Sequence, residues 1–413
     1  MNAAEARGPQ EVVLPKIKTD SGNQRSPQYR FRSSSKQFVC VELLQDGNHK
    51  TFSELFSLLC LDKDQRNSLH PDTSTLRAPL LEEQLEKMET IKLHLSRAEQ
   101  AERTGSWTAV CEQRLLLGLH FSAPEDVWLA LYFFHSCADR KHGGGSRAAT
   151  EARACLADIY LRRGDLEQAR QQGELCLRQA EDGGWLDSSG VSLKLRACLV
   201  LGKTYGWLAD AQLAASDCDK ALKLLHKGHS MSKECDNKLI EAEVVFRFGL
   251  THQSSGDQET AKQFFNTCIE IYNSLQNRDE IVKVLKAMAK SFEKEGNIEE
   301  TVQCLEKSAD ICRSSGLPSK LADICLCLGN IYYKTSQYVK AYKCFLQGYE
   351  VACEAGDVAL LQKAQVMVGC SCALPLIRTY SSDMESASSA TVKRLVAWKE
   401  SRGHQDLITD PAE

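Results

Sequence analysis

One 21-residue pattern returns at a fixed interval in the C-terminal half of the chain. It starts at Phe248, Met288 and Leu328, so both intervals are 40 residues long, and an earlier version occupies 156–176. Each version has an apolar residue followed by a small one, usually an aromatic three positions later, then a polar turn and a second small-then-apolar face. This order predicts a helix, a tight turn and a helix. Because one such hairpin cannot bury its apolar stripe alone, neighbouring hairpins must stack into a solenoid.

The composition agrees with an all-α protein that stays inside the cell. A chain of 413 residues exceeds what one compact core usually serves, but a solenoid grows by adding repeats. We find no apolar stretch close to the roughly 20 residues that span a bilayer, which predicts no membrane partner. The first 20 residues lack the apolar core of a signal peptide, so we expect a cytoplasmic or cytoskeletal location.

Cysteine usage argues against a disulfide-bonded protein, and the net charge argues against a nucleic-acid binder. The 18 cysteines are scattered singly, including Cys176, Cys268, Cys304 and Cys344, where a reduced thiol is expected to act as a small buried hydrophobe. A net charge of −4 argues against an overall basic nucleic-acid binder. The sequence therefore predicts protein partners and no nucleic acid.

The composition predicts three parts along the chain. Residues 1–79 are expected to form a largely disordered basic arm, with one or two short helices on either side of Asp46-Gly47. Residues 80–375 carry the helical repeats, and 376–413 are expected to form a loose polar tail with a short helix at 391–399. The helix before the tail, over 358–374, is expected to end at Pro375.

The version at 201–228 differs from the others. Its first-helix signature is read at Leu201, Gly202 and Tyr205, and the next small residue, Ala221, comes seven residues later than in the other versions. The extra residues, at 206–219, predict either elongated helices or an excursion of the chain, and the pattern does not decide between them.

Five versions of the pattern resemble the tetratricopeptide repeat family, in which paired antiparallel helices coil into a right-handed superhelix. The period of 40 exceeds the common 34 and the closing proline is missing, which is typical of a longer-helix subclass in cytoskeletal and transport adaptors. The residues that carry the resemblance are Leu156, Ala157, Tyr160, Gly164 and Ala169; Leu201, Gly202, Tyr205 and Ala221; Phe248, Gly249, His252, Gly256, Ala261 and Phe265; Met288, Ala289, Phe292, Gly296 and Leu305; and Leu328, Gly329, Tyr332, Ala341 and Phe345.

The order of the segments "RTGSWTAVCEQRLLLGLHF", "DRKHGGG" and "RRGDLEQA" is similar to that of a branch of this family found in motile cilia and the sperm flagellum. This resemblance implies a non-catalytic axonemal scaffold that supports flagellar assembly and beating, with axonemal or intraflagellar transport partners. The alternative is a cytosolic peptide-binding adaptor of signalling or motor-cargo type.

The small residues of the pattern predict close helix contacts. Glycine inside a helix costs about 1 kcal/mol relative to alanine, and close approach of two helix backbones offsets that cost. The predicted small positions are Ala157, Gly202, Gly249, Ala289 and Gly329, with Tyr160, Tyr205, Phe292 and Tyr332 filling the space one turn later. Gly164, Gly256 and Gly296 are expected at the hairpin turns.

The motifs that suggest chemistry are weak. "HGGG" at 142–145 lacks the Gly-x-Ser-x-Gly elbow that would accompany it in a lipase. Cysteines two apart, at 325 and 327 and at 370 and 372, point to opposite sides of a helix. His226 and His229 share a helix face, but no further ligand converges on them, and both are expected to be exposed. We therefore predict no catalytic, cofactor or metal site and no small-molecule substrate.

The resemblance implies a concave groove lined by the first helices. The residues of this chain at the groove positions form a basic surface with apolar and aromatic contact points. Such a surface favours an acidic peptide or helix as its ligand. The alternative is an ordinary solvated face. The family's chaperone-tail clamp is disfavoured, because Lys290 and Cys327 stand where asparagines are needed. The predicted groove residues are Arg196, Leu199, Lys203, Trp207, Lys283, Lys286, Lys290, Glu293, Lys294, Leu326, Asn330, Tyr333 and Lys334.

Overall fold

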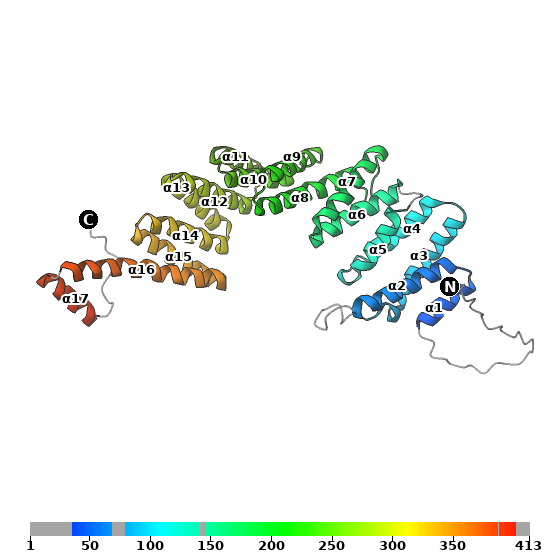
Figure 1. Cartoon of the computed structure of the whole chain (residues 1–413), viewed down its shortest axis with the longest axis horizontal. Coiled ribbons are helices and arrows are strands. Elements are labelled where there is room, and N and C mark those ends of the chain that lie inside the picture. Colours follow the sequence, from blue (N-terminus) through cyan, green and yellow to red (C-terminus); the bar gives the residue numbers. More distant parts are fainter. Residues whose placement is uncertain (1–34, 68–78, 141, 143–144, 387, 402–413) are drawn as a thin grey trace, which may run out of the picture. The chain divides into compact units, whose positions relative to one another are not determined.

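Helices make up the regular structure of the chain. A computed structural model describes residues 35–67, 79–140, 142, 145–386 and 388–401 (Figure 1). Within these ranges the only β-type pairing is one isolated bridge between Leu186 and Ser192. The chain divides into two units, Met1–Ser96 and Arg97–Glu413. The predicted all-α solenoid is confirmed, and the predicted boundary between residues 79 and 80 falls inside the first unit.

The first unit contains a helical hairpin. Helices α1 (Ser35–Gln45) and α2 (His49–Asn67) meet at Gly47, whose φ of 72° ends α1 where a break was predicted. A short 3-10 turn, η2 (Leu81–Glu83), packs on both. The predicted helices are confirmed, although α2, with 19 residues, is not short. The predicted disorder of the arm concerns residues 1–34, which lie outside the described residues.

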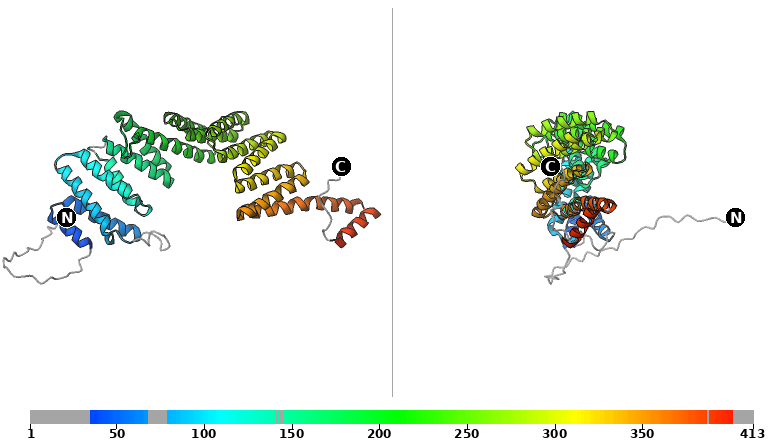
Figure 2. Two further views of the ribbon diagram at one scale, coloured as in Figure 1. Left: turned by 180° about the vertical axis from the view of Figure 1, so that it is seen from behind. Right: turned by 90° about the vertical axis from the view of Figure 1, so that its left-hand side faces the viewer.

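The second unit is a stack of antiparallel hairpins in which each helix from α4 to α17 packs on a sequence neighbour. Alternate helices also touch, α6 with α8, α8 with α10 and α10 with α12, as stacking requires (Figures 1 and 2). The bounds are α3 (Leu85–Arg103), which begins in the first unit, α4 (Trp107–His120), η3 (Pro124–Asp126), α5 (Val127–Ala138), α6 (Arg147–Arg163), α7 (Leu166–Gly183), α8 (Leu193–Ala214), α9 (Cys218–Glu234), α10 (Lys238–Ser255), α11 (Gln258–Ser274), α12 (Arg278–Glu295), α13 (Ile298–Ser315), α14 (Pro318–Lys334), α15 (Tyr338–Ala355), α16 (Val358–Ser386) and α17 (Ser389–Ser401).

Most hairpin turns of the second unit contain a left-handed residue, and several are followed by a helix cap. Gly256 and Gly296 have φ of 95° and 84°, as predicted for turn glycines, and Ser216 and Ser336 take the same place with φ of 63° and 62°. The next residue often caps the second helix: the side chain of Asp257, for example, accepts a hydrogen bond from the Thr260 amide. Left-handed backbone followed by a cap reverses the chain within two residues.

The turn at Ser216 corrects the register predicted for α8. Ser216 lies 40 residues before Gly256, so the small position equivalent to Gly249 is Ala209, not Gly202. Ala209 packs with Ala221 and Leu225 of α9. Leu201-Gly202 imitates the signature because it lies two helical turns earlier on the same face.

The seven extra residues are therefore not an insertion in the hairpin. Helix α8 has 22 residues against 18 in α10, and with the turn at Ser216 in register its additional residues lie at its N-terminal end. Of the two predicted outcomes, the elongated helix is confirmed. The true interruption of the period is the loop at 184–192, between α7 and α8, because Ala157 and Ala209 are 52 residues apart.

The predicted close approaches at glycines are confirmed. A Cβ at Gly249 would lie 2.5 Å from a ring carbon of Phe265, and one at Gly329 would lie 2.4 Å from Phe345. Gly202 is also tightly packed: a Cβ there would lie 2.9 Å from the Ile240 side chain of α10 and 3.8 Å from the Gly228 carbonyl oxygen of α9. Among the aromatic residues predicted to fill the space, Tyr205 is buried, and Tyr160, Phe292 and Tyr332 are half-buried.

Several cysteines occupy a second small position, where the two helices of a hairpin cross. The thiols of Cys137, Cys176 and Cys268 each donate to a backbone carbonyl 26 residues earlier, at 3.2, 3.4 and 3.3 Å. Gly228 and Gly348 stand at equivalent places. Cys176 and Cys268 are fully buried, as predicted, whereas Cys304 and Cys344 are only half-buried.

Helix α16 contradicts two predictions. It runs through Pro375 to Ser386, so Pro375 does not end it and 376–386 is not a loose tail. Leu360, Met367 and Val368 pack on the core around Phe345, and such contacts outweigh the cost of about 3 kcal/mol for an internal proline.

Helix α16 also has the length and composition to cross a membrane, with a mean hydropathy of 1.4 in its most apolar window. The prediction that no apolar stretch approaches the length of a membrane span is therefore wrong. Length and composition are weak evidence for a span. The helix predicted at 391–399 is confirmed as α17.

Candidate functional site

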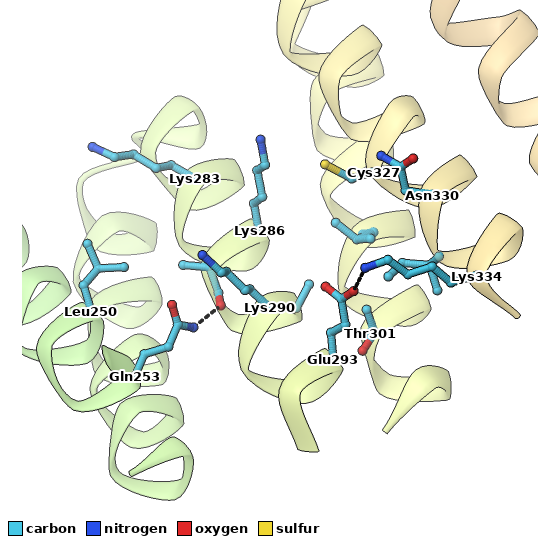
Figure 3. Close-up of a pocket in the computed structure, with 14 residues that line it drawn as sticks. Leu250, Gln253, Lys283, Lys286, Lys290, Glu293, Thr301, Cys327, Asn330 and Lys334 are labelled. Carbon is cyan, nitrogen blue, oxygen red and sulfur yellow. Dashed lines mark hydrogen bonds and ion pairs between the residues drawn. The ribbon is translucent and has the colours of Figure 1, made fainter. Parts of the chain in front are cut away.

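The first helices of three successive hairpins, α10, α12 and α14, border a groove of about 400 Å³ (Figure 3). Lys283, Lys286 and Lys290 follow one another along α12 and are flanked by α10 on one side and α14 on the other. Because the period of 40 brings equivalent positions to the same face of the stack, these side chains converge from different hairpins. The lining residues are Leu250, Gln253, Lys283, Lys286, Ala287, Ala289, Lys290, Glu293, Thr301, Leu305, Cys327, Asn330, Ile331 and Lys334.

Ion pairs tie the walls of the groove together. Lys286 of α12 pairs with Asp323 of α14, and Lys334 of α14 pairs with Glu293 of α12, with 2.6 Å between Nζ and Oε1. Lys294 donates to the backbone carbonyl of Gln253 on α10 at 3.0 Å. Burial lowers the pKa of Lys286, but the hydrogen bond to Asp323 and the electrostatic effects of Cys327 and Asp323 together outweigh burial and raise the pKa above 10.5, so the cation persists at neutral pH.

Two lysines of α12 remain available to a ligand. Lys283 pairs loosely with Glu280 at 3.3 Å and lies 5.1 Å from the centre of the Phe246 ring. Lys290 is exposed and, within the described part of the chain, makes no ion pair or hydrogen bond. The groove therefore offers one unpaired ammonium group, with further cations on either side of it.

Two groove residues from α10 were missed. Leu250 and Gln253 form the α10 wall, and Gln253 is held in place by hydrogen bonds to the Ala287 carbonyl at 2.8 Å and to the Ser291 hydroxyl at 2.7 Å. The signal was present in the sequence, because the positions one and four after Gly249 are these two residues.

Several predicted groove residues lie elsewhere. Leu326 is fully buried against Ala341 and Phe345, so its assignment to the groove was wrong. Tyr333 stacks edge-on against Tyr338, with 5.6 Å between ring centres. Lys294 is exposed but does not line the groove.

The residues predicted from α8 do not join the groove, which is lined by residues of α10, α12, α13 and α14. Leu199 packs against the core near α9 and α10, whereas Lys203 and Trp207 are exposed. Arg196 borders a separate cavity of about 440 Å³ next to α4, α5 and α6, where it bonds Asp158 at 2.7 Å and Asp187 at 3.1 Å.

The histidine pair is placed differently from the prediction. His226 is exposed, but His229 is half-buried beside Phe248, and burial lowers its pKa. Within the described ranges, no group of three or more His, Cys, Asp or Glu side chains is arranged to hold a metal ion. The site built from these residues is a charged groove between helices.

A family model and a solved structure are similar to parts of the chain. The tetratricopeptide repeat family model matches residues 242–275, which span most of α10 and all of α11. A signal transduction ATPase from Pyrococcus horikoshii with a tetratricopeptide repeat sensor is 14% identical, with 75% of this chain and 46% of that chain covered and a TM-score of 0.44.

Curated relatives extend the similarity to almost the whole chain. Tetratricopeptide repeat protein 29 of Homo sapiens is 31% identical over 386 residues, which cover 92% of this chain and 81% of that protein. The protein of the same name from Macaca fascicularis is 31% identical over 390 residues, covering 92% and 80%. The chain therefore belongs to the tetratricopeptide repeat protein 29 family.

Proposed function

We propose that this chain is a non-catalytic scaffold of the axoneme in motile cilia and the sperm flagellum, where it supports flagellar assembly and beating. The observation that carries the proposal is the sequence similarity to members of this family over 92% of the chain. The ciliary placement, with delivery by intraflagellar transport, follows the resemblance to the ciliary branch.

The groove of α10, α12 and α14 is the proposed docking site for an acidic segment of a partner protein. Lys290 supplies the unpaired cation, Leu250 an apolar foothold, and Asn330 an amide that both donates and accepts hydrogen bonds. The ion pairs between α12 and α14 keep these two walls at a fixed spacing before a ligand arrives. Such preorganisation lowers the entropy cost of binding.

The basic lining also favours a second function, that of a reversible cytosolic adaptor for acidic peptides. The two functions differ in salt sensitivity. A peptide held mainly by exposed lysines is released as salt screens the charges, whereas a large docked interface resists salt.

Fractionation of isolated motile cilia separates these outcomes. After detergent removes the membrane, axonemes are washed with salt up to about 1 M, where the Debye length is about 3 Å. We expect the chain to stay with the axoneme through these washes. Release near physiological ionic strength, or recovery in the cytosol alone, would favour the adaptor and contradict the scaffold.

A further inference from the structure

Helix α16 exposes a straight apolar stripe, here called the α16 seam. Its six residues alternate four and three positions apart, which places them on one face of the helix. Four of them are large and exposed, with exposed fractions of 63% for Val366, 56% for Ile377, 44% for Tyr380 and 56% for Met384. The seam consists of Val366, Cys370, Ala373, Ile377, Tyr380 and Met384.

The rest of α16 is held by the stack, which fixes the direction of the seam. Ala364 and Met367 pack into the core around Phe345, and the Arg378 guanidinium lies 4.9 Å from the centre of the Tyr338 ring at the start of α15. The helix runs alongside α15 and then continues past it to α17 (Figure 1). Contiguous exposed apolar surface of this kind marks an interaction site.

We propose that the α16 seam docks antiparallel on the same seam of a second copy of this chain. In that arrangement the two helices are related by a two-fold axis at Pro375. Val366 then faces Met384 of the second copy, Cys370 faces its Tyr380, and Ala373 faces its Ile377. Each pair joins a smaller side chain to a larger one, as interdigitated packing requires.

A parallel, in-register pairing fits less well. It would set Tyr380 against Tyr380 and Ala373 against Ala373, so that the helices would be forced apart at one level and leave a gap at another. The charges at the ends of the seam also favour the antiparallel pairing. Lys363 precedes the seam and Glu385 follows it, both exposed, so only the antiparallel pairing brings opposite charges together at both ends.

The dimensions of the seam set the expected strength. From Val366 to Met384 the helix rises about 27 Å at 1.5 Å per residue, and this single contact lies at the small end of the range for stable complexes. The dimer should therefore dissociate on dilution. This surface is distinct from the groove, so the dimer and the proposed function stand or fall separately.

Sedimentation of the full chain over a range of concentrations tests the dimer. The mass should rise from the 46.0 kDa of one chain towards twice that value. Ile377→Asp puts a charge in the seam and should weaken association at least tenfold. Gln365→Asp adds the same charge on an exposed position outside the seam and should leave association unchanged.

Circular dichroism of both variants serves as the control, and both should keep the helical signal of the wild type. A wild-type chain that stays at 46.0 kDa throughout, or two variants that behave alike, would overturn the proposal.

Crosslinking tests the antiparallel direction. Tyr380→Cys places a thiol opposite Cys370 of the second copy, and mild oxidation should join positions 370 and 380 of different chains, as mapped by mass spectrometry. Links between two residues numbered 370, or between two numbered 380, would overturn the antiparallel arrangement. A third experiment tests whether α16 binds a membrane instead, because this helix has the length of a membrane span. The chain is mixed with phosphatidylcholine vesicles and centrifuged, and a chain that floats with the vesicles as a monomer would overturn the dimer.

Discussion

At the scale of single residues, two glycines are dictated by the phenylalanines that face them. At Gly329 and Gly249 a Cβ would come within 2.4 and 2.5 Å of the rings of Phe345 and Phe265, closer than carbon atoms approach without a shift of ring or helix. Glycine is therefore required at these two positions, because the second helix of the same hairpin packs too closely to leave room for a side chain.

Gly329→Ala should destabilise the chain although alanine favours helix. Because the added methyl group overlaps the Phe345 ring, the free energy of unfolding should fall by about 1–3 kcal/mol in urea denaturation. The matched control is Gly369→Ala in α16, where no atom lies within 4 Å of the added Cβ. This control should be neutral or gain up to about 1 kcal/mol. Equal effects at the two sites would contradict the packing role of Gly329.

Asp187, in the loop at 184–192, should make stability depend on pH in the acid range. Burial raises its pKa, but hydrogen bonds from the Ser189 side chain and from the amides of Val191 and Ser189, together with Arg196, outweigh burial and hold the pKa below 3.8. A lowered folded-state pKa gives stability that is present above the unfolded value of about 3.9 and is lost as pH falls through the folded pKa.

The test compares Asp187→Asn with the wild type in urea at several pH values. The wild type should be more stable at pH 7, and the difference should shrink as pH falls below about 4. Asp182→Asn, at an exposed position, is the control and should show no such trend. A difference for Asp187→Asn that is the same at all pH values would argue against the ionised carboxylate.

The sequence predicted which residues must be small but not what faces them. Tyr332 was assigned to the space beside Gly329, whereas the ring that fills it, Phe345, comes 16 residues after Gly329 on the second helix. Phe265 lies at the same distance after Gly249. Periodicity identifies a helix face, but the side chain that fills a gap is chosen by the tilt between the two helices.

At the scale of elements, the register of α8 shows how a helical pattern misleads. Leu201-Gly202 and Leu208-Ala209 differ by seven residues, close to two turns, so both pairs present a small residue on nearly the same face. The turn decides between them, because the left-handed residue at Ser216 falls 40 residues before Gly256. A serine at this place gives a weaker turn signal than a glycine, which contributed to the error.

Ala209→Leu tests the corrected register. Ala209 is buried against α9, so a larger side chain there should overpack the contact and lower the free energy of unfolding by about 1–3 kcal/mol. Ala211→Leu, at an exposed position on the same helix, is the matched control and should be nearly neutral. If Ala209→Leu were tolerated as well as the control, the assignment of Ala209 to the repeat position would be wrong.

The continuation of α16 through Pro375 is a case of tertiary packing overriding a local signal. The proline removes one hydrogen-bond donor, but contacts with α15 extend as far as Arg378, beyond the proline. A single sequence shows the local cost of the proline and not the neighbouring helix that offsets it, so the end of this helix could not be predicted.

At the scale of the whole molecule, the candidate groove joins residues that are far apart in the sequence. Lys283, Lys286 and Lys290 were predicted because a fixed period places equivalent positions on one face. The residues assigned from α8 lie elsewhere, because the groove is lined by residues of α10, α12, α13 and α14. Lys286 and Lys334 form ion pairs, whereas Lys290 does not. This difference depends on the distances between helices, which a repeat pattern in the sequence does not give.

The most direct test of the account is proximity labelling in ciliated cells with three forms of the chain. The wild type should label axonemal proteins. Lys290→Glu reverses the unpaired groove cation and should lose a defined subset of these proteins several-fold, whereas Lys307→Glu, the same change on an exposed position of α13 outside the groove, should keep the wild-type profile. Identical profiles for all three forms, or a wild-type profile without axonemal proteins, would contradict a scaffold that holds its partners in this groove.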